Sequence, residues 1–250
     1  MKKVLVLVLL CLAPSMSFTQ DLLVAAAADL NFALPEIAAR YQQKTGKKVA
    51  FTFGSSGNFY QQIRNGAPFD MFFSADEGYP AKLQHEGFAA PGTLYTYAVG
   101  RLVLYVPSSS KLDLSQGLKV LLSPEIRKIA IANPQHAPYG HAAMQALTSQ
   151  GLYDRVKDKL VLGENISQTA QFVESENADI GIIALSLASA PAMRAKGRFL
   201  EVPPADYAPL RQAVIVIKTA PHQQNAKEFL EFLERPDILE LLSQYGFARP

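Results

Sequence analysis

Two kinds of hydrophobic pattern alternate along this chain. Short runs rich in β-branched and aromatic residues are separated by longer stretches in which apolar residues recur every three or four positions, as in amphipathic helices. The runs predict eight strands: Leu22–Ala27, Lys48–Phe53, Asp70–Ser74, Tyr97–Val106, Ile129–Ala132, Leu160–Leu162, Asp179–Ile183 and Ala213–Lys218. Regular alternation of strands and helices predicts an α/β protein with largely parallel sheets and helices on both faces.

The intervening stretches predict helices that end at turn residues. Leu30–Lys44 carries a continuous apolar face and stops before Gly46, a usual helix terminator. Pro35 falls inside this stretch, where it would remove a backbone hydrogen bond, so either the helix starts later or it kinks, and we expect the kink. The remaining predicted helices are Gly57–Asn65, Ala142–Gln150, Gln168–Asn177 and two within Asn225–Tyr245, broken at Pro236.

Two strand-like runs divide the chain into two predicted lobes. Tyr97–Val106 and Ala213–Lys218 are long enough to cross between lobes. We therefore expect a first lobe from residues 21–101 and 204–250, and a second, inserted lobe from residues 102–203. In such proteins a ligand binds in the cleft, where strand carboxyl ends meet helix N-termini.

The N-terminus has the pattern of a secretory signal peptide. Met1-Lys2-Lys3 precedes an apolar stretch from Val4 to Ala13 that is too short for a membrane span, and small residues follow. We expect residues 1–20 to be removed and the protein to lie in a bacterial periplasm. The single cysteine, Cys11, belongs to this leader, so the mature chain has no disulfide or thiol chemistry. Leu10 precedes Cys11 where a lipoprotein would carry a small residue.

The mature chain is close to neutral. Of the 24 Lys and Arg residues, Lys2 and Lys3 lie in the leader, which leaves 22 basic against 22 acidic side chains. Without a basic run, nucleic-acid binding is not expected.

Four predicted strands stop in small or polar residues just where a helix begins. A helix N-terminus carries unpaired N–H groups and the positive end of the helix dipole, so it binds anions without a Lys or Arg. Four such ends directed at one point would enclose a small oxyanion. They are Val24–Asp29, Phe53–Asn58, Asn133–Gly140 and Leu162–Ser167.

The same segments carry a family resemblance over nearly the whole mature chain. The matching blocks are VAAAADL at 24–30, GSSG at 54–57, GAP at 66–68, FFSADE at 72–77, IANPQHAPYG at 131–140, ADIGIIA at 178–184 and QYGF at 244–247. In this order they resemble the periplasmic molybdate-binding proteins of ABC importers.

The resemblance implies a two-lobed periplasmic-binding-protein fold of type II that closes on molybdate or tungstate. It implies a monomer that delivers the anion to a membrane permease, with no catalysis, no cofactor and no direct ligand to the metal atom. Carried over position by position, the oxyanion-binding residues are Ala28, Asp29, Ser55, Ser56, Tyr139 and Ile166.

Two departures from the family pattern stand out. Many relatives have Ser or Thr at the position of Ala28, so one hydroxyl donor is missing here. Some relatives have Tyr at the position of Ala184, and Tyr139 would supply the phenol instead.

The residues also leave alternatives open. Asp29 is most simply the N-cap of the following helix, turned away from the ligand. A carboxylate facing the cleft would instead favour an anion that brings a proton, such as phosphate; sulfate and phosphonates are further candidates.

An enzyme on the same scaffold would need a His or carboxylate in the cleft. His136 and His141 lack the i, i+4 spacing of helical zinc sites and are expected to line a loop or to lie on the surface. Asp76 and Glu77 are expected to be cap and surface residues.

Overall fold

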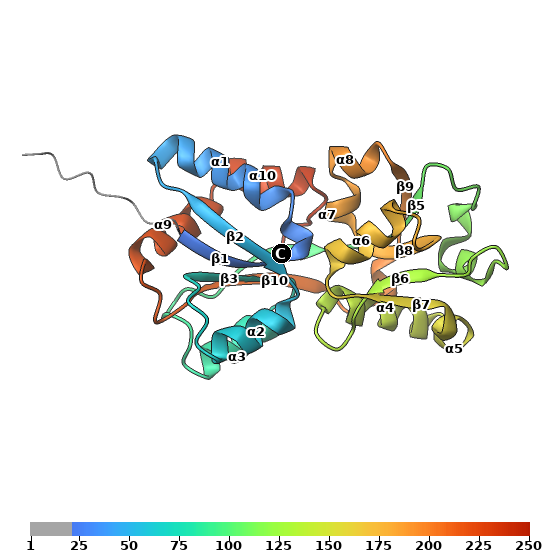
Figure 1. Cartoon of the computed structure of the whole chain (residues 1–250). Coiled ribbons are helices and arrows are strands. Elements are labelled where there is room, and N and C mark those ends of the chain that lie inside the picture. Colours follow the sequence, from blue (N-terminus) through green and yellow to red (C-terminus); the bar gives the residue numbers. More distant parts are fainter. Residues whose placement is uncertain (1–21) are drawn as a thin grey trace, which may run out of the picture.

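The computed structural model describes residues 22–250 and shows two α/β lobes side by side (Figure 1). Each lobe is built on one five-stranded sheet. The predicted signal peptide, residues 1–20 with Cys11, lies outside the described residues. Among residues 22–250, no helix is both long and apolar enough to cross a lipid bilayer.

The first sheet has the strand order β2-β1-β3-β10-β4. Its strands are β1 (Leu22–Ala27), β2 (Val49–Gly54), β3 (Met71–Ser74), β4 (Tyr95–Gly100) and β10 (Leu210–Val216). The helices of this lobe are η1 (Ala28–Leu30), α1 (Ala33–Thr45), α2 (Ser56–Arg64), α3 (Gly78–His85), α9 (Gln223–Leu233) and α10 (Pro236–Gln244). One face of the sheet packs on α1, α9 and α10, and the other on α2 and α3.

The second sheet has the order β7-β6-β8-β5-β9. Its strands are β5 (Leu102–Pro107), β6 (Ile129–Ala132), β7 (Leu160–Gly163), β8 (Ile180–Ala184) and β9 (Gly197–Glu201). Its helices are η2 (Leu114–Leu122), α4 (Pro138–Ser149), α5 (Tyr153–Val156), η3 (Lys157–Lys159), α6 (Ile166–Glu174), α7 (Leu185–Ala188) and α8 (Pro191–Arg194), and η4 (Pro204–Asp206) lies in the return to the first lobe.

The two-lobed α/β prediction is confirmed, but the sheets are mixed rather than mostly parallel. In the first sheet β1 pairs in parallel with β2 and β3, whereas β10 runs antiparallel to β3 and β4. The second sheet repeats this arrangement, with β5 antiparallel to β8 and β9.

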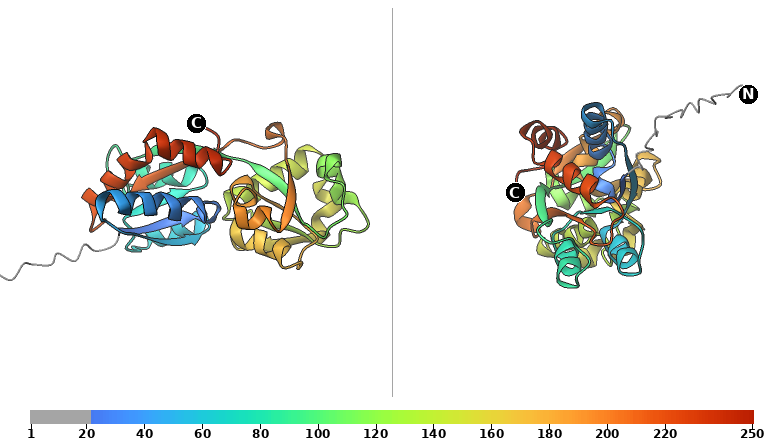
Figure 2. Two further views of the ribbon diagram at one scale, coloured as in Figure 1. Left: turned by 90° about the horizontal axis from the view of Figure 1, so that it is seen from above. Right: turned by 90° about the vertical axis from the view of Figure 1, so that its left-hand side faces the viewer.

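The antiparallel strands are those that connect the lobes. Arg101 alone separates β4 from β5, so the predicted run Tyr97–Val106 divides there into one strand for each sheet. The chain returns through residues 202–209, between β9 and β10. Figure 2 shows these extended segments passing between the lobes. The lobe boundaries themselves stay a prediction.

The expected kink at Pro35 is wrong. Helix α1 begins at Ala33 rather than Leu30, which places Pro35 in its first turn. A proline there costs no hydrogen bond, because first-turn N–H groups have no partner within the helix. The break at Pro236 is confirmed, since Pro236 is the first residue of α10.

Candidate functional site

The four predicted strand ends meet at one small cavity between the lobes. Its lining comprises Ala27–Asp29, Gly54–Ser56, Ala75, Ala137–Tyr139 and Ile166. All six residues predicted to bind an oxyanion are therefore brought together, although their role as ligands stays a prediction. The cavity volume is about 10 Å³, close to the least that holds a water molecule. In this conformation the cavity has room for little more than a water molecule, so an oxyanion must widen it and a sugar, peptide or nucleotide would have to widen it far more.

The two serines of the site lie at the start of α2. Ser55 is the N-cap: its Oγ accepts from the Asn58 N–H at 3.4 Å and lies 2.8 Å from His136 Nδ1. The Oγ of the buried Ser56 accepts from the Ala75 N–H at 2.9 Å. Since that bond uses Ser56 as an acceptor, its hydroxyl proton remains to donate to another group.

Helices α4 and α6 bring two N-termini from the second lobe. Tyr139 is the second residue of α4, behind Pro138, and is buried. Ile166 is the first residue of α6, where the Asn165 side chain caps the N–H groups of Ser167 and Gln168. The N–H groups of these first turns have no acceptor within their own helices and carry the positive end of each dipole.

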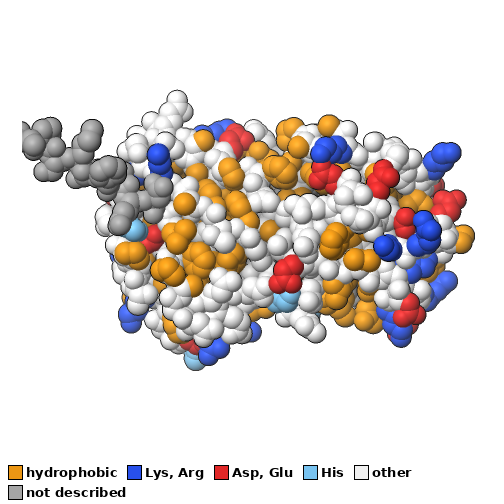
Figure 3. All heavy atoms as spheres, in the orientation of Figure 1, with side chains coloured by type: hydrophobic (Ala, Val, Ile, Leu, Met, Phe, Trp, Pro, Cys, Tyr) orange, Lys and Arg blue, Asp and Glu red, His pale blue; other side chains and the backbone are white. Residues whose placement is uncertain are grey.

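No Lys or Arg of the described chain lines the cavity. Basic and acidic side chains are instead interspersed on the visible surface (Figure 3). A positive potential in the cavity therefore has to come from N–H and O–H groups.

Asp29 differs from its expected role as a helix cap. It lies inside the short turn η1, and the turn has no side-chain cap. Its carboxyl is buried, and Oδ2 accepts from Gln212 Nε2 at 2.5 Å. Burial raises the pKa of Asp29 to about 7, although the hydrogen bonds from Gln212 and Tyr139 oppose this shift. The carboxyl is thus directed into the protein between the lobes and not toward the N–H groups of its own turn.

Sequence patterns did not indicate Gln212 or Tyr97, which complete this polar cluster. The Tyr97 hydroxyl donates to Gln212 Oε1 at 2.8 Å, and Gln212 Nε2 donates to Tyr139 Oη at 3.0 Å. All four side chains are buried. A signal existed in the sequence, since Gln212 directly precedes the apolar run Ala213–Val216, but the predicted strand began one residue later.

The lobes touch on both sides of the cavity. On one side the Gly57 N–H donates to the His136 carbonyl at 2.9 Å, and Asn58 Nδ2 donates to Glu164 Oε1 at 2.7 Å. On another, Ser186 Oγ donates to the Asp29 carbonyl at 2.8 Å. These bonds join segments of both sheets, so the structure represents the closed arrangement of the lobes.

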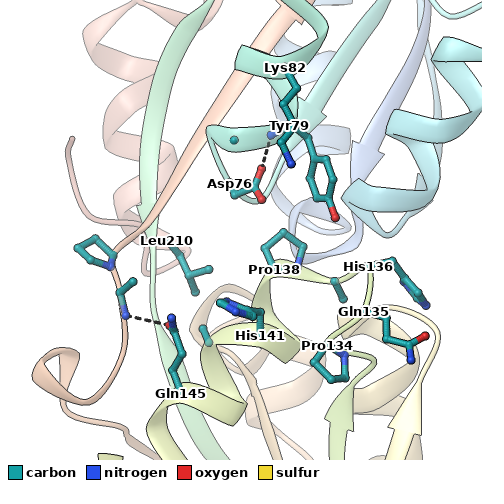
Figure 4. A pocket seen from close by; sticks show the side chains of 15 residues that line it. Asp76, Tyr79, Lys82, Pro134, Gln135, His136, Pro138, His141, Gln145 and Leu210 are labelled. Carbon is teal, nitrogen blue, oxygen red and sulfur yellow. Dashed lines mark hydrogen bonds between the residues drawn. The ribbon is translucent and has the colours of Figure 1, made fainter.

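A larger groove of about 460 Å³ lies beside the closed cavity (Figure 4). His136 and His141 line this groove. His136 lies in the loop before α4, as expected, whereas His141 is an exposed residue within α4 and not in a loop. Asp76 accepts from the Tyr79 N–H at 3.1 Å and so caps α3, and burial raises its pKa. Within residues 22–250, no group of three or more His, Cys, Asp or Glu side chains is placed to hold a metal ion.

Comparison with known proteins identifies the family. Residues 22–248 match the family model described as bacterial extracellular solute-binding protein. The chain is 40% identical over 227 residues to the molybdate-binding protein ModA of Rhodobacter capsulatus. This alignment covers 90% of this chain and 88% of that protein. The chain belongs to the bacterial extracellular solute-binding protein family.

Solved structures agree with this assignment. The periplasmic molybdate-binding protein of Azotobacter vinelandii superposes with a TM-score of 0.87 at 37% identity, over 92% of this chain and all of that one. The sulfate-binding protein SubI of Mycobacterium tuberculosis superposes with a TM-score of 0.73, over 92% of this chain and 86% of that one. At 16% identity this likeness shows the shared fold alone. As a solute-binding protein, periplasmic or extracellular, this chain is not an enzyme.

Proposed function

We propose that this solute-binding protein captures molybdate or tungstate and delivers it to the permease of an ABC importer. The observation that carries this proposal is the convergence of Ala28, Asp29, Ser55, Ser56, Tyr139 and Ile166 on one buried cavity without a Lys or Arg. The ligands named for the most similar relatives support it.

The donor set suits a fully deprotonated oxyanion. Backbone N–H groups at helix N-termini and the Ser56 and Tyr139 hydroxyls donate, and hydrogen bonds to an ionised acceptor are roughly twice as strong as neutral ones. A tetrahedral ion has only five heavy atoms, so its entry requires less widening of this small cavity than the entry of a larger organic ligand would. Sulfate has the same charge but is smaller, so donors fixed for molybdate cannot all reach it.

The lobes provide the capture step. We expect residues 21–101 with 204–250, and residues 102–203, to rotate against each other about the two connecting segments. The ligand stabilises the closed state because Ser56 belongs to the first lobe, whereas Tyr139 and Ile166 belong to the second. The protein would act as a monomer, with exposed surfaces of the lobes meeting the permease.

Asp29 gives a specific reason to consider a second ligand class. An ionised carboxylate about 4 Å from a dianion would repel it by about 8 kcal/mol at an effective dielectric constant near 20. An anion that carries a proton, such as hydrogen phosphate, would avoid this repulsion by donating to Asp29. Phosphate is therefore the alternative that the site itself suggests.

Isothermal titration calorimetry at pH 7 with molybdate, tungstate, sulfate and phosphate distinguishes these ligands. The proposal predicts one-to-one binding of molybdate and tungstate, and no measurable heat from sulfate or phosphate. Binding of phosphate in preference to molybdate would establish the alternative.

A further inference from the structure

The carboxyl of Asp29 has one oxygen without a partner. Asp29 lines the cavity and is 1% exposed. Its Oδ2 accepts from Gln212, but its Oδ1 is buried and has no hydrogen-bond partner among the described residues. A buried polar oxygen of this kind is uncommon, because leaving it unpaired costs stability.

The surrounding cluster fixes which groups can serve Oδ1. Tyr97 donates to Gln212 Oε1, so the amide of Gln212 is oriented with Nε2 toward Asp29 and Tyr139. Both amide protons are then used, one on Asp29 Oδ2 and one on Tyr139 Oη. Gln212 therefore has nothing further to offer Oδ1. The Tyr139 hydroxyl also faces this carboxyl, but it makes no hydrogen bond to Oδ1, so the ligand is the remaining partner for this atom.

The chemistry of the ligand decides what must lie between the two oxygens. A deprotonated oxyanion has only acceptors, and so has an ionised carboxylate, so the pair would repel. A single proton on Oδ1 turns this repulsion into a hydrogen bond. We propose that Asp29 takes up one proton when the oxyanion binds, so that the carboxyl Oδ1–H donates to a ligand oxygen. This inference rests on the proposed function.

The electrostatics of the site agree with this role. Burial already raises the pKa of Asp29 to about 7, and a dianion beside the carboxyl raises it further. The other titratable groups facing Asp29 are Tyr139 on α4 and Tyr97 on β4, and burial raises the pKa of each well above its ordinary value of 10. Both phenols thus stay neutral between pH 6 and 9. Asp76 after β3 and His136 beside Ser55 lie in the same region and serve as controls.

Proton uptake makes oxyanion affinity depend on pH in a defined way. Below pH 7 Asp29 is already mostly protonated, so the molybdate Kd is nearly constant. Above pH 7 the molybdate Kd rises about fivefold from pH 7 to 8 and about ninefold from pH 8 to 9, so binding weakens about 50-fold between pH 7 and 9. At pH 8, calorimetry in Tris and in HEPES, buffers with different ionisation enthalpies, should report about 0.9 proton taken up per molybdate bound.

Asp29→Asn provides the decisive variant. Its amide can donate to the ligand without a titrating proton and can still accept from Gln212. We expect a molybdate Kd that is independent of pH from 6 to 9, no proton uptake, and tighter binding than the wild type at pH 9. Asp76→Asn removes a nearby, partly buried carboxyl and His136→Gln removes a nearby imidazole. Both should keep the wild-type slope, whatever their affinity.

The outcomes separate this inference from the proposed function. If the wild type binds molybdate with a Kd independent of pH and without proton uptake, the inference is wrong while the function stands. The same holds if Asp29→Asn keeps the slope, or if a control abolishes it. If molybdate binds at no pH, the proposed function fails and the inference fails with it.

Discussion

Gly57 tests whether the lobes close as the structure shows. It is the second residue of α2, and its N–H donates to the His136 carbonyl of the other lobe at 2.9 Å. A Cβ at this position would lie 2.7 Å from the His136 carbonyl oxygen, 2.9 Å from His136 Cα and 2.7 Å from the Tyr79 hydroxyl. The Gly57→Ala variant should therefore bind molybdate more weakly without losing its fold.

The size of the effect follows from these distances. Ordinary van der Waals contacts begin near 3.4 Å, so the His136 backbone must retreat by roughly 0.5 to 0.7 Å. This displacement lengthens the bond between the lobes, which contributes about 1 kcal/mol, and misaligns charge-assisted bonds that contribute about 1.5–3 kcal/mol each. A loss of about 2–3 kcal/mol corresponds to roughly 30- to 150-fold weaker binding. Alanine is also the better helix former, by about 1 kcal/mol.

The assay combines calorimetry with thermal unfolding. Gly57→Ala should show the weaker Kd, and its ligand-free melting temperature should equal or exceed that of the wild type. Gly78→Ala is the matched control: it makes the same change in the first turn of α3, where a Cβ would meet nothing closer than 3.8 Å. Wild-type affinity in Gly57→Ala would refute the closed arrangement as the binding state.

Three further variants test individual groups. Ser56→Ala removes a donor to the oxyanion and leaves the buried Ala75 N–H unpaired. It should weaken molybdate binding by about 1–3 kcal/mol in calorimetry and also lower the melting temperature. An unchanged Kd would mean that Ser56 is only structural. Tyr139→Phe removes the phenol while keeping the ring, so a Kd equal to the wild type would exclude the hydroxyl as a ligand. Asp29→Asn should stabilise the ligand-free protein at pH 8, by up to about 4 kcal/mol. A pKa raised from 3.8 to about 7 means that the wild type loses stability as pH rises through this range, so denaturation curves of the two proteins should coincide near pH 3 and diverge by pH 8.

Buried, apolar elements were predictable from the sequence alone. The bounds of β1 and β6 agree with the prediction because both strands consist almost entirely of buried residues. Strand β9 was missed, since Gly197–Glu201 is an exposed edge strand with charged residues and no clear alternation. Strand direction was also misjudged, because it depends on how the chain crosses between lobes and not on local pattern.

The convergence of the candidate residues on one cavity was predictable, but the chemistry of Asp29 was not. Small residues at four strand ends signalled where N–H groups converge. An Asp before an apolar helix is typical of an N-cap, yet here the turn begins one residue earlier and leaves Asp29 inside it. Its partner Gln212 is 183 positions away in the sequence. No local pattern links them, so only the packing of the lobes reveals the pair.

Crystals grown with tungstate test the central claim most directly, because tungsten scatters anomalously and marks its own position. The account predicts one strong anomalous peak between the lobes, with oxyanion oxygens within hydrogen-bond distance of Ser56 Oγ, Tyr139 Oη and the Ile166 N–H. A peak elsewhere, or none between the lobes at saturating tungstate, would contradict it.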